Sequence, residues 1–374
     1  MTSRPTLPGD VEIVIVGAGV AGLCSALFLA RAGREVAVLD RAEPWGDASG
    51  ANAGTLSIQV KRPEVLALTI ESTRLWRDFA EAFAIDVGFV GCGGLRVATS
   101  PAEVARLRDT VPDQRSRGLD VELLEGDALR DAAPWLGRDV LAAAHCPSDG
   151  FSVPLSAGLG LIRAVGRAGG RVIGEAGVEA IEGAAGGFRV ATAAGALRCR
   201  TVVLAAGAWL ADVAAMLDVE LPVMVDVNML TITEPARVIM DRVVTHAGGM
   251  LSVKQYANGT CIIGGGWQGR GGPESGAKEL DYERLLHNLR FAARVVPALA
   301  ELRLVRSWSG FEAVAPDALP LFGALPGRDG AFVVGGARGG YSQGPALGQL
   351  MCQLVTTGRT SLPMERFDPA RFVT

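Results

Sequence analysis

A glycine-rich turn near the N-terminus has the residue types and spacing that could hold a phosphate group. Residues 17–22 read Gly-Ala-Gly-Val-Ala-Gly, the pattern G-x-G-x-x-G, and follow the β-rich apolar run at residues 11–16 directly. Gly17 permits a tight turn, Gly19 lets the backbone approach a pyrophosphate, and Gly22 lets the next helix lie close to the sheet. Free N–H groups and the macrodipole at a helix N-terminus favour negative charge. The motif therefore indicates a site for a dinucleotide.

An acidic residue follows at the expected distance. The helix after the motif is predicted to end at Gly33, and a second strand at residues 35–39 ends at Asp40, 18 residues after Gly22. At this spacing a carboxylate accepts hydrogen bonds from an adenosine ribose. A preference for NADP would place a basic residue here, so NAD and FAD remain open.

Two more segments combine an apolar, strand-like run with small or glycine residues after it. Residues 202–209 form an apolar run that ends in small residues. Residues 331–336 form another, which leads into a glycine-rich turn at 337–345 and then into helical composition. Such turns place backbone N–H donors around an anion or a polar ring edge.

Composition narrows the class of protein. The chain has 374 residues, 36 basic and 40 acidic, which give a net charge of −4. This balance argues against nucleic acid or an anionic membrane as partner. No apolar run approaches the roughly 18 residues of a membrane-spanning helix, and the N-terminal residues lack a signal-peptide pattern, so we expect a cytoplasmic location. Six scattered cysteines and three histidines predict no metal site.

The chain resembles the D-amino-acid-oxidase-like (DAO) family of FAD-dependent amine and amino-acid oxidoreductases over nearly its whole length. Five pieces in the family's order carry the resemblance: residues 17–40; ASGANAG at 48–54, similar to A-S-x-x-N-A-G; AAGAW at 205–209, similar to A-x-G-x-W; WSGF at 308–311 with PDALP at 316–320, similar to W-x-G…P-D-x-x-P; and the turn at 337–345. Residues 51–59, 254–255 and 263–268 are most similar to the β subunits of opine oxidase, of hydroxyproline or proline dehydrogenase, and of hydrogen cyanide synthase.

The resemblance implies bound FAD and a set of cofactor-binding residues. The FAD is expected to be non-covalent, because members that tether it carry a cysteine shortly before P-D, and residues 310–312 contain none. The implied FAD-binding residues are Gly17, Gly19, Gly22, Asp40, Arg41, Ser49, Asn52, Ala53, Gly54, Val178, Ala206, Gly207, Trp209, Gly336, Gly339, Gly340 and Tyr341.

The resemblance also implies a substrate site. Glycine-oxidase-like members grip a carboxylate with an arginine in W-x-G-x-R and another in the C-terminal turn; the second is retained as Arg338, whereas the first position reads Glu312. This departure permits a larger amino acid with a cationic end facing Glu312, and it leaves open a solvated Glu312 and a loop salt bridge for Arg338. The implied catalytic residues are Arg338, Tyr341 and Glu312, and the implied substrate-binding residues are Lys254, Gln255, Trp267 and Arg338.

The fold implied by the resemblance is α/β. A Rossmann-like FAD-binding domain with a parallel central sheet is expected from residues 1–75, 145–220 and 328–374. It interleaves with a mixed-sheet α+β substrate-binding domain from residues 76–144 and 221–327.

The implied function is oxidation of a secondary amine or amino acid, such as an opine, proline or hydroxyproline, by hydride transfer to flavin N5. We expect the chain to be the catalytic subunit of a multi-subunit dehydrogenase, a hetero-oligomer whose partner subunits carry electrons onward and hold FMN or an iron–sulfur cluster. Three alternatives stay open: a self-contained glycine- or sarcosine-oxidase-like enzyme that reduces O₂ to H₂O₂, an FAD-bound assembly subunit without turnover, and a plain NAD-linked dehydrogenase.

Overall fold

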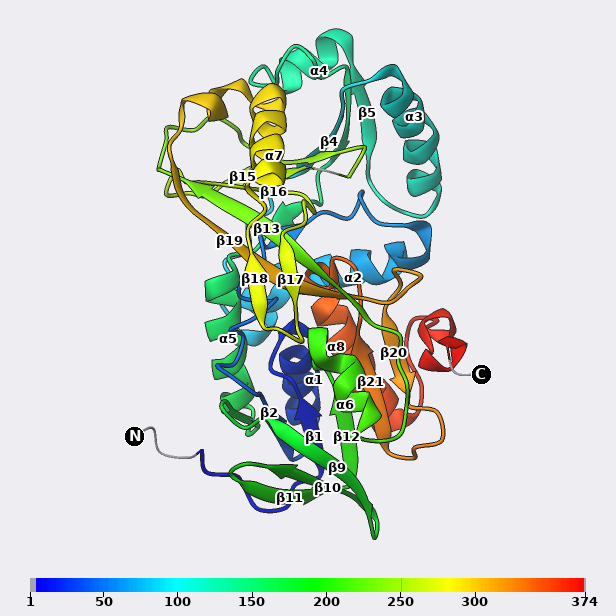
Figure 1. Ribbon diagram of the computed structural model, residues 1–374. Coiled ribbons are helices and arrows are strands. Elements are labelled where there is room, and N and C mark those ends of the chain that lie inside the picture. Colours follow the sequence, from blue (N-terminus) through cyan, green and yellow to red (C-terminus); the bar gives the residue numbers. More distant parts are fainter. Residues whose placement is uncertain (1–4, 250, 373–374) are drawn as a thin grey trace.

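The structure is a computed structural model that describes residues 5–249 and 251–372. A six-stranded sheet occupies its lower half in Figure 1. In spatial order the strands are β20 (Leu321–Ala324), β21 (Ala331–Gly335), β12 (Thr201–Leu204), β1 (Ile13–Val16), β2 (Val36–Leu39) and β8 (Arg171–Ile173). The strands from β21 to β8 run parallel, and β20 is antiparallel at the edge. The predicted parallel central sheet is confirmed.

Both faces of this sheet are covered, as its uniformly apolar strands require. One face packs against α1 (Val20–Arg31), α2 (Pro63–Phe83), α5 (Pro154–Arg167) and α8 (Gly340–Thr357). The other packs against α6 (Leu210–Ala215) and a three-stranded antiparallel sheet of β9 (Val178–Ala184), β10 (Gly187–Thr192) and β11 (Gly195–Cys199).

A mixed eight-stranded sheet forms the upper half of the molecule (Figure 1). Its order is β19 (Leu304–Val314), β13 (Met224–Thr233), β16 (Cys261–Gly264), β15 (Ser252–Gln255), β14 (Val243–His246), β4 (Gly94–Ala98), β6 (Ala142–Cys146) and β5 (Glu122–Glu125). The pair β14–β4 is parallel, and the other neighbours are antiparallel. The helices of this half are α3 (Pro101–Ser116), α4 (Gly126–Ala132) and α7 (Tyr282–Val295).

Two short antiparallel ribbons are also present: β3 (Thr55–Leu56) with β7 (Gly150–Phe151), and β17 (Arg270–Gly272) with β18 (Ala277–Glu279). The described part of the chain also contains four 3₁₀ segments: η1 (Gly207–Trp209), η2 (Pro297–Glu301), η3 (Glu365–Phe367) and η4 (Pro369–Phe372). None of the helices within the described residues is both long and apolar enough to cross a membrane.

Three of the expected domain limits differ from the element boundaries. The limit at 75/76 falls inside α2, whose buried Trp76 and Phe79 belong to the core beneath the six-stranded sheet. The limit at 144/145 falls inside β6, and β20, expected in the second domain, pairs with β21 at the edge of the first sheet. These element boundaries depend on side-chain packing and strand pairing, which the sequence motifs do not reveal. The two-domain division itself stays a prediction.

Candidate functional site

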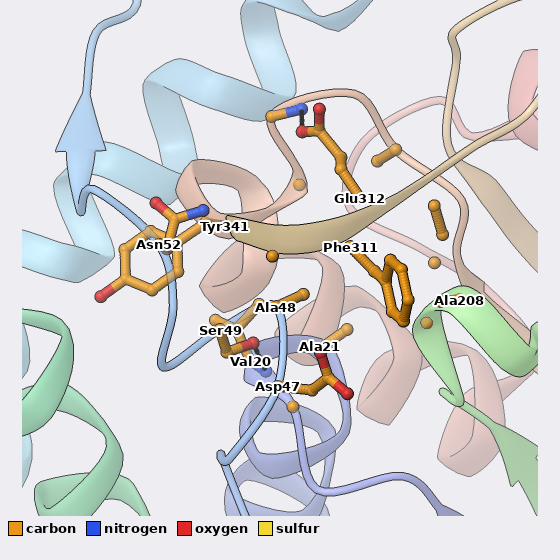
Figure 2. A pocket seen from close by; sticks show the side chains of 18 of the residues that line it. Val20, Ala21, Asp47, Ala48, Ser49, Asn52, Ala208, Phe311, Glu312 and Tyr341 are labelled. Atoms are coloured by element: carbon orange, nitrogen blue, oxygen red, sulfur yellow. Dashed lines mark hydrogen bonds between the residues drawn. The ribbon is translucent and has the colours of Figure 1, made fainter. Parts of the chain in front are cut away.

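A large cavity is lined by residues of both sheets. Its volume is about 1120 Å³, above the roughly 300–1,000 Å³ typical of small-molecule pockets. The lining comes from the turn after β1, the loop that follows β2, the start of η1, strands β13 and β19, and the turn before α8. Figure 2 shows labelled side chains from the start of α1, the loop that follows β2, η1, β19 and the start of α8 around one shared space. The cavity has room for a dinucleotide together with a small substrate.

The first glycine turn forms one wall of this cavity. Gly17 has φ +109°, and a Cβ there would lie 2.4 Å from the carbonyl oxygen of Ala205. Gly17 and Gly19 line the cavity, whereas Gly22 lies behind it, where a Cβ would meet the Gly17 oxygen at 1.9 Å. The Oγ of Ser49 accepts a hydrogen bond of 2.9 Å from the backbone N–H of Val20, which fixes the next loop over the start of α1 (Figure 2). The start of α1 therefore faces the cavity, with its Val20 N–H bonded to Ser49.

The Asp40 carboxylate and a cation–π pair of Arg41 and Trp209 line the cavity next to the first glycine turn. The carboxylate of Asp40 accepts hydrogen bonds from the backbone N–H groups of Ala18, at 2.7 Å, and Ala42, at 3.0 Å. Burial raises the pKa of Asp40. The Arg41 guanidinium lies 3.9 Å from the centroid of the Trp209 ring. Val178, Ala206 and Gly207 complete this part of the lining.

The loop at 48–54 is tied to both halves of the molecule. Asn52 Oδ1 accepts a hydrogen bond of 2.8 Å from Gly54 N–H. Gly54 has φ +73°, and a Cβ would lie 2.2 Å from the Ser152 oxygen, so the turn needs glycine although Gly54 lies outside the lining. Trp308 Nε1 donates to the Ala51 oxygen at 2.9 Å. Ser49, Asn52 and Ala53 face the cavity as a result.

The turn before α8 forms the opposite wall. Gly336 and Gly339 have φ +59° and +65°, and α8 begins at Gly340, so its N-terminus also opens onto the cavity. The Tyr341 ring stacks on Trp76 at 5.2 Å between centroids, and its hydroxyl pairs with Ser152 Oγ at 2.7 Å. Burial raises the pKa of Tyr341. The Tyr341 ring and hydroxyl are thus both held by neighbours in the wall, and its expected catalytic role stays a prediction.

A family model described as DAO, FAD dependent oxidoreductase, matches residues 12–354. The chain belongs to the DAO family. It is 28% identical to the glycine oxidase of Geobacillus kaustophilus (strain HTA426) over 97% of each chain. It is 26% identical to a subunit of the opine oxidase of Agrobacterium tumefaciens (strain Ach5), over 97% of this chain and 98% of that one. The solved L-proline dehydrogenase from P. horikoshii superimposes with a TM-score of 0.90 at 25% identity, covering 98% of both chains. The resemblance drawn from the motifs is confirmed.

The cavity of this DAO-family chain fits FAD. Close backbone contacts exclude a Cβ at Gly17 and Gly22, so the cradle is specific to glycine. The N-termini of α1 and α8 both face the cavity, and a helix N-terminus favours negative charge. The Val20 N–H of the first is bonded to Ser49, and the Gly339 N–H of the second is bonded to Glu312. The adenosine end would lie by Asp40 and Arg41, and the ring end by Gly339.

Three charged groups of this family member meet beside the α8 turn. Glu312 Oε1 accepts a hydrogen bond of 2.6 Å from Gly339 N–H (Figure 2), and its Oε2 accepts one of 2.8 Å from Asn228. Arg338 is half-exposed; it forms an ion pair with Asp226 and lies 3.7 Å from Glu312. Arg338 is thus paired with Asp226, and Glu312 is hydrogen-bonded to Gly339 and Asn228; the expected role of Arg338 as a carboxylate anchor stays a prediction. A substrate carboxylate at Arg338 must therefore compete with Asp226.

Three expected substrate-binding residues lie outside the described lining. Lys254 is 1% exposed, and only its hydrogen-bond partner Thr55 reaches the cavity. The Gln255 side chain binds the backbone of residues 236–239 and Gly259, so it braces a loop. The Trp267 ring lies 6.2 Å from that of His287, whose helix, α7, covers the upper sheet. The structure does not bring Gln255 and Trp267 to the cavity wall. Gln255 binds the loop at 236–239 from β15, and Trp267, in the segment after β16, lies beside His287 of α7.

Two charged residues in or near the cavity wall were not predicted from the sequence: Lys61, which is partly buried, and Asp149, which is fully buried. Lys61 lines the cavity and donates to the Gly339 oxygen at 3.1 Å; burial lowers its pKa to about 8, against the opposing effect of Glu312 and Asp149. Asp149 is fully buried and accepts hydrogen bonds from Ser57, from the Ile58 N–H and from Gln59. Lys61 could have been identified from the sequence, because it lies in the segment that follows the A-S-x-x-N-A-G turn. Asp149 carried no motif.

Proposed function

We propose that this FAD-dependent amine and amino-acid oxidoreductase oxidises a secondary amine or amino acid, as the catalytic subunit of a multi-subunit dehydrogenase. The observation that carries the proposal is one shared cavity. It is lined by the turn before α1, by the turn before α8 and by charged side chains. The similarity to an opine oxidase subunit over nearly its full length supports the subunit role.

The residues of the chain have distinct parts in this proposal. FAD, when bound, supplies the acceptor for a hydride from the carbon next to the substrate nitrogen. The N–H groups at the start of α8 stabilise negative charge at that end of the cavity. Arg338 holds the substrate carboxylate with two parallel hydrogen bonds, the geometry that a guanidinium group offers. The stacked Tyr341 and Trp76 rings close the wall against water.

Electrons leave this chain for a partner subunit, for which we propose FMN or an iron–sulfur cluster as the acceptor. The proposed location is the cytoplasm. The alternative with specific support is a self-contained oxidase, because the similarity to a glycine oxidase covers 97% of each chain. Stopped-flow reoxidation of the reduced holoprotein by O₂ separates the two: slow reoxidation, with fast transfer to an artificial acceptor, supports the dehydrogenase, and fast reoxidation supports the oxidase.

An anaerobic screen tests the proposed chemistry itself. The panel contains octopine, nopaline, L- and D-proline, trans-4-hydroxy-L-proline, sarcosine and glycine, and the visible flavin band reports reduction. We expect at least one secondary amine to bleach the band within the mixing experiment. If no member bleaches it, the chain is better described as an assembly subunit without turnover.

Arg338→Lys should weaken capture of a carboxylate substrate by about tenfold to a hundredfold, because lysine keeps the charge but loses the paired hydrogen bonds. The measurement is KM for the amine identified in the screen, with flavin content unchanged. Asp226→Asn should act in the opposite direction, because it removes the competing carboxylate. The control is Arg294→Lys, which alters an exposed ion pair with Asp139. An unchanged KM in Arg338→Lys would reject Arg338 as the anchor.

A further inference from the structure

Lys254 is a buried cation outside the cavity lining. It lies on β15, is 1% exposed, and donates a hydrogen bond of 3.0 Å to Thr55 Oγ1. The rings of Phe151 and Tyr256 lie 5.6 and 5.8 Å from its Nζ. Within residues 5–249 and 251–372, no carboxylate pairs with it. A buried ammonium group without an acidic partner is costly, so the neutral amine becomes accessible.

The titratable groups around Lys254 keep their protonation state near neutral pH. Burial lowers the pKa of Lys254 itself to about 7. The titratable groups that face it are the Cys92 thiol and the Tyr256 phenol. Burial raises the pKa of Cys92 and raises that of Tyr256 to about 12, so both stay protonated near neutral pH. Of these three groups, Lys254 alone changes its charge there.

Two hydroxyl groups connect Lys254 to the cavity. Thr55 Oγ1 lies 2.9 Å from Ser252 Oγ, and both residues line the cavity. Ser252 precedes Lys254 by two positions on β15, so the two side chains share one face of the strand. A hydroxyl donates and accepts at once, so this row can pass a proton along its length.

We propose that Ser252, Thr55 and Lys254 form a relay that takes a proton from the ammonium group of a substrate in the cavity, so that the amine is neutral when its C–H bond is oxidised. The inference rests on the proposed function. It assigns a proton acceptor other than Glu312, the cavity-lining carboxylate beside the α8 turn, which already accepts hydrogen bonds from Gly339 N–H and Asn228.

The proton step balances without any added reactant. One N–H bond of the substrate ammonium breaks as an O–H bond forms on Ser252. The original Ser252 proton moves to Thr55 Oγ1, and the original Thr55 proton moves to the lone pair of neutral Lys254 Nζ. The substrate ends as a neutral amine and Lys254 as an ammonium ion; no electrons leave either molecule. The proton returns to solvent by the reverse path when the cavity empties.

The first test is the pH profile of anaerobic flavin reduction, with sarcosine and L-proline as the amines. Lys254 must be neutral to accept a proton, so the reduction rate constant of the unmodified holoprotein should rise with pH through about 7. In Lys254→Met the midpoint should move upward by at least about one unit, toward the pKa of the amine itself, because the amine must then lose its proton in solution.

Substitutions at Thr55 separate the relay from a structural role of Lys254. Thr55→Val removes the connecting hydroxyl, retains the side-chain shape and leaves Lys254 in place, and it should shift the midpoint as Lys254→Met does. Thr55→Ser should restore the original profile. A rate that falls by the same factor at every pH, with an unmoved midpoint in Lys254→Met and Thr55→Val, would overturn the relay while the proposed function stands.

A second readout needs no turnover. The chain has three lysines, Lys61, Lys254 and Lys278, so each ¹³Cε signal can be assigned by one substitution. We expect a signal that titrates near 7 and disappears in Lys254→Met. A Lys254 signal that titrates near the ordinary lysine value of about 10.4 would contradict the relay. If the lysine titrates near 7 but no amine reduces the flavin, the proposed function fails, and the relay fails with it because it has no substrate proton to take.

Discussion

Gly19→Val is expected to give a folded protein that no longer holds FAD, with a loss of affinity of at least about a hundredfold. Gly19 lines the cavity, and a side chain there would occupy the space in which the cofactor approaches the backbone at the start of α1. Its Cβ would meet Ser49 Oγ alone, at 3.2 Å, so the substitution strains little of the protein itself. Flavin content after purification and equilibrium titration with FAD measure the effect.

The matched control for this substitution is Gly166→Val in α5. A Cβ at Gly166 has no neighbour within 4 Å among the described residues, so this variant should keep its FAD and its melting temperature within a few degrees. Circular dichroism establishes that Gly19→Val is folded. Normal flavin content in a folded Gly19→Val protein would mean that the cofactor does not approach α1 as described.

Asp149→Ala is expected to lower the free energy of unfolding by about 3–5 kcal/mol, because it leaves several buried donors without an acceptor. The carboxylate is fully buried and binds Ser57 Oγ at 2.6 Å, Ile58 N–H at 2.6 Å and Gln59 Nε2 at 3.0 Å. These residues belong to the segment that carries Thr55 and Lys61 into the cavity. Urea denaturation of the FAD-free chain measures the loss.

Asp139→Ala is the control for Asp149→Ala. Asp139 is exposed and forms a surface ion pair with Arg294, which contributes at most about 1 kcal/mol. Equal stability of the two variants would show that the Asp149 hydrogen bonds do not hold the segment at 57–59 in place.

Elements that are neighbours in the chain could be predicted from the sequence. The strand, glycine turn, helix and acid at residues 11–40 are neighbours in the chain, so their geometry follows from their spacing, and β1, α1 and β2 lie where expected. The same holds for the strand and glycine turn before α8.

Contacts between distant segments could not be predicted in this way. Lys61 meets the Gly339 oxygen across 278 positions, and Arg338 meets Asp226 across 112. Neither pair has a spacing that a motif could reveal. The first joins the segment before α2 to the turn before α8, and the second joins that turn to β13 of the eight-stranded sheet. The same contacts decide that Arg338 is already paired before any substrate arrives.

Gln255 shows a related limit. It lies beside Lys254 on β15, and successive residues of a strand point to opposite faces. The alternation sends Lys254 toward Thr55 and Gln255 toward the loop at 236–239. The family resemblance covers both Lys254 and Gln255. It could not show which of the two side chains lies on which face of β15 until the register of that strand was known.

The crystal structure of the FAD-loaded protein is the most direct test of the account. We predict adenine beside Val178 and the Arg41–Trp209 pair, the pyrophosphate at the start of α1, and the flavin ring against the turn at residues 336–341. A flavin ring at the Val178 end, or a cofactor bound outside the cavity of about 1120 Å³, would contradict it.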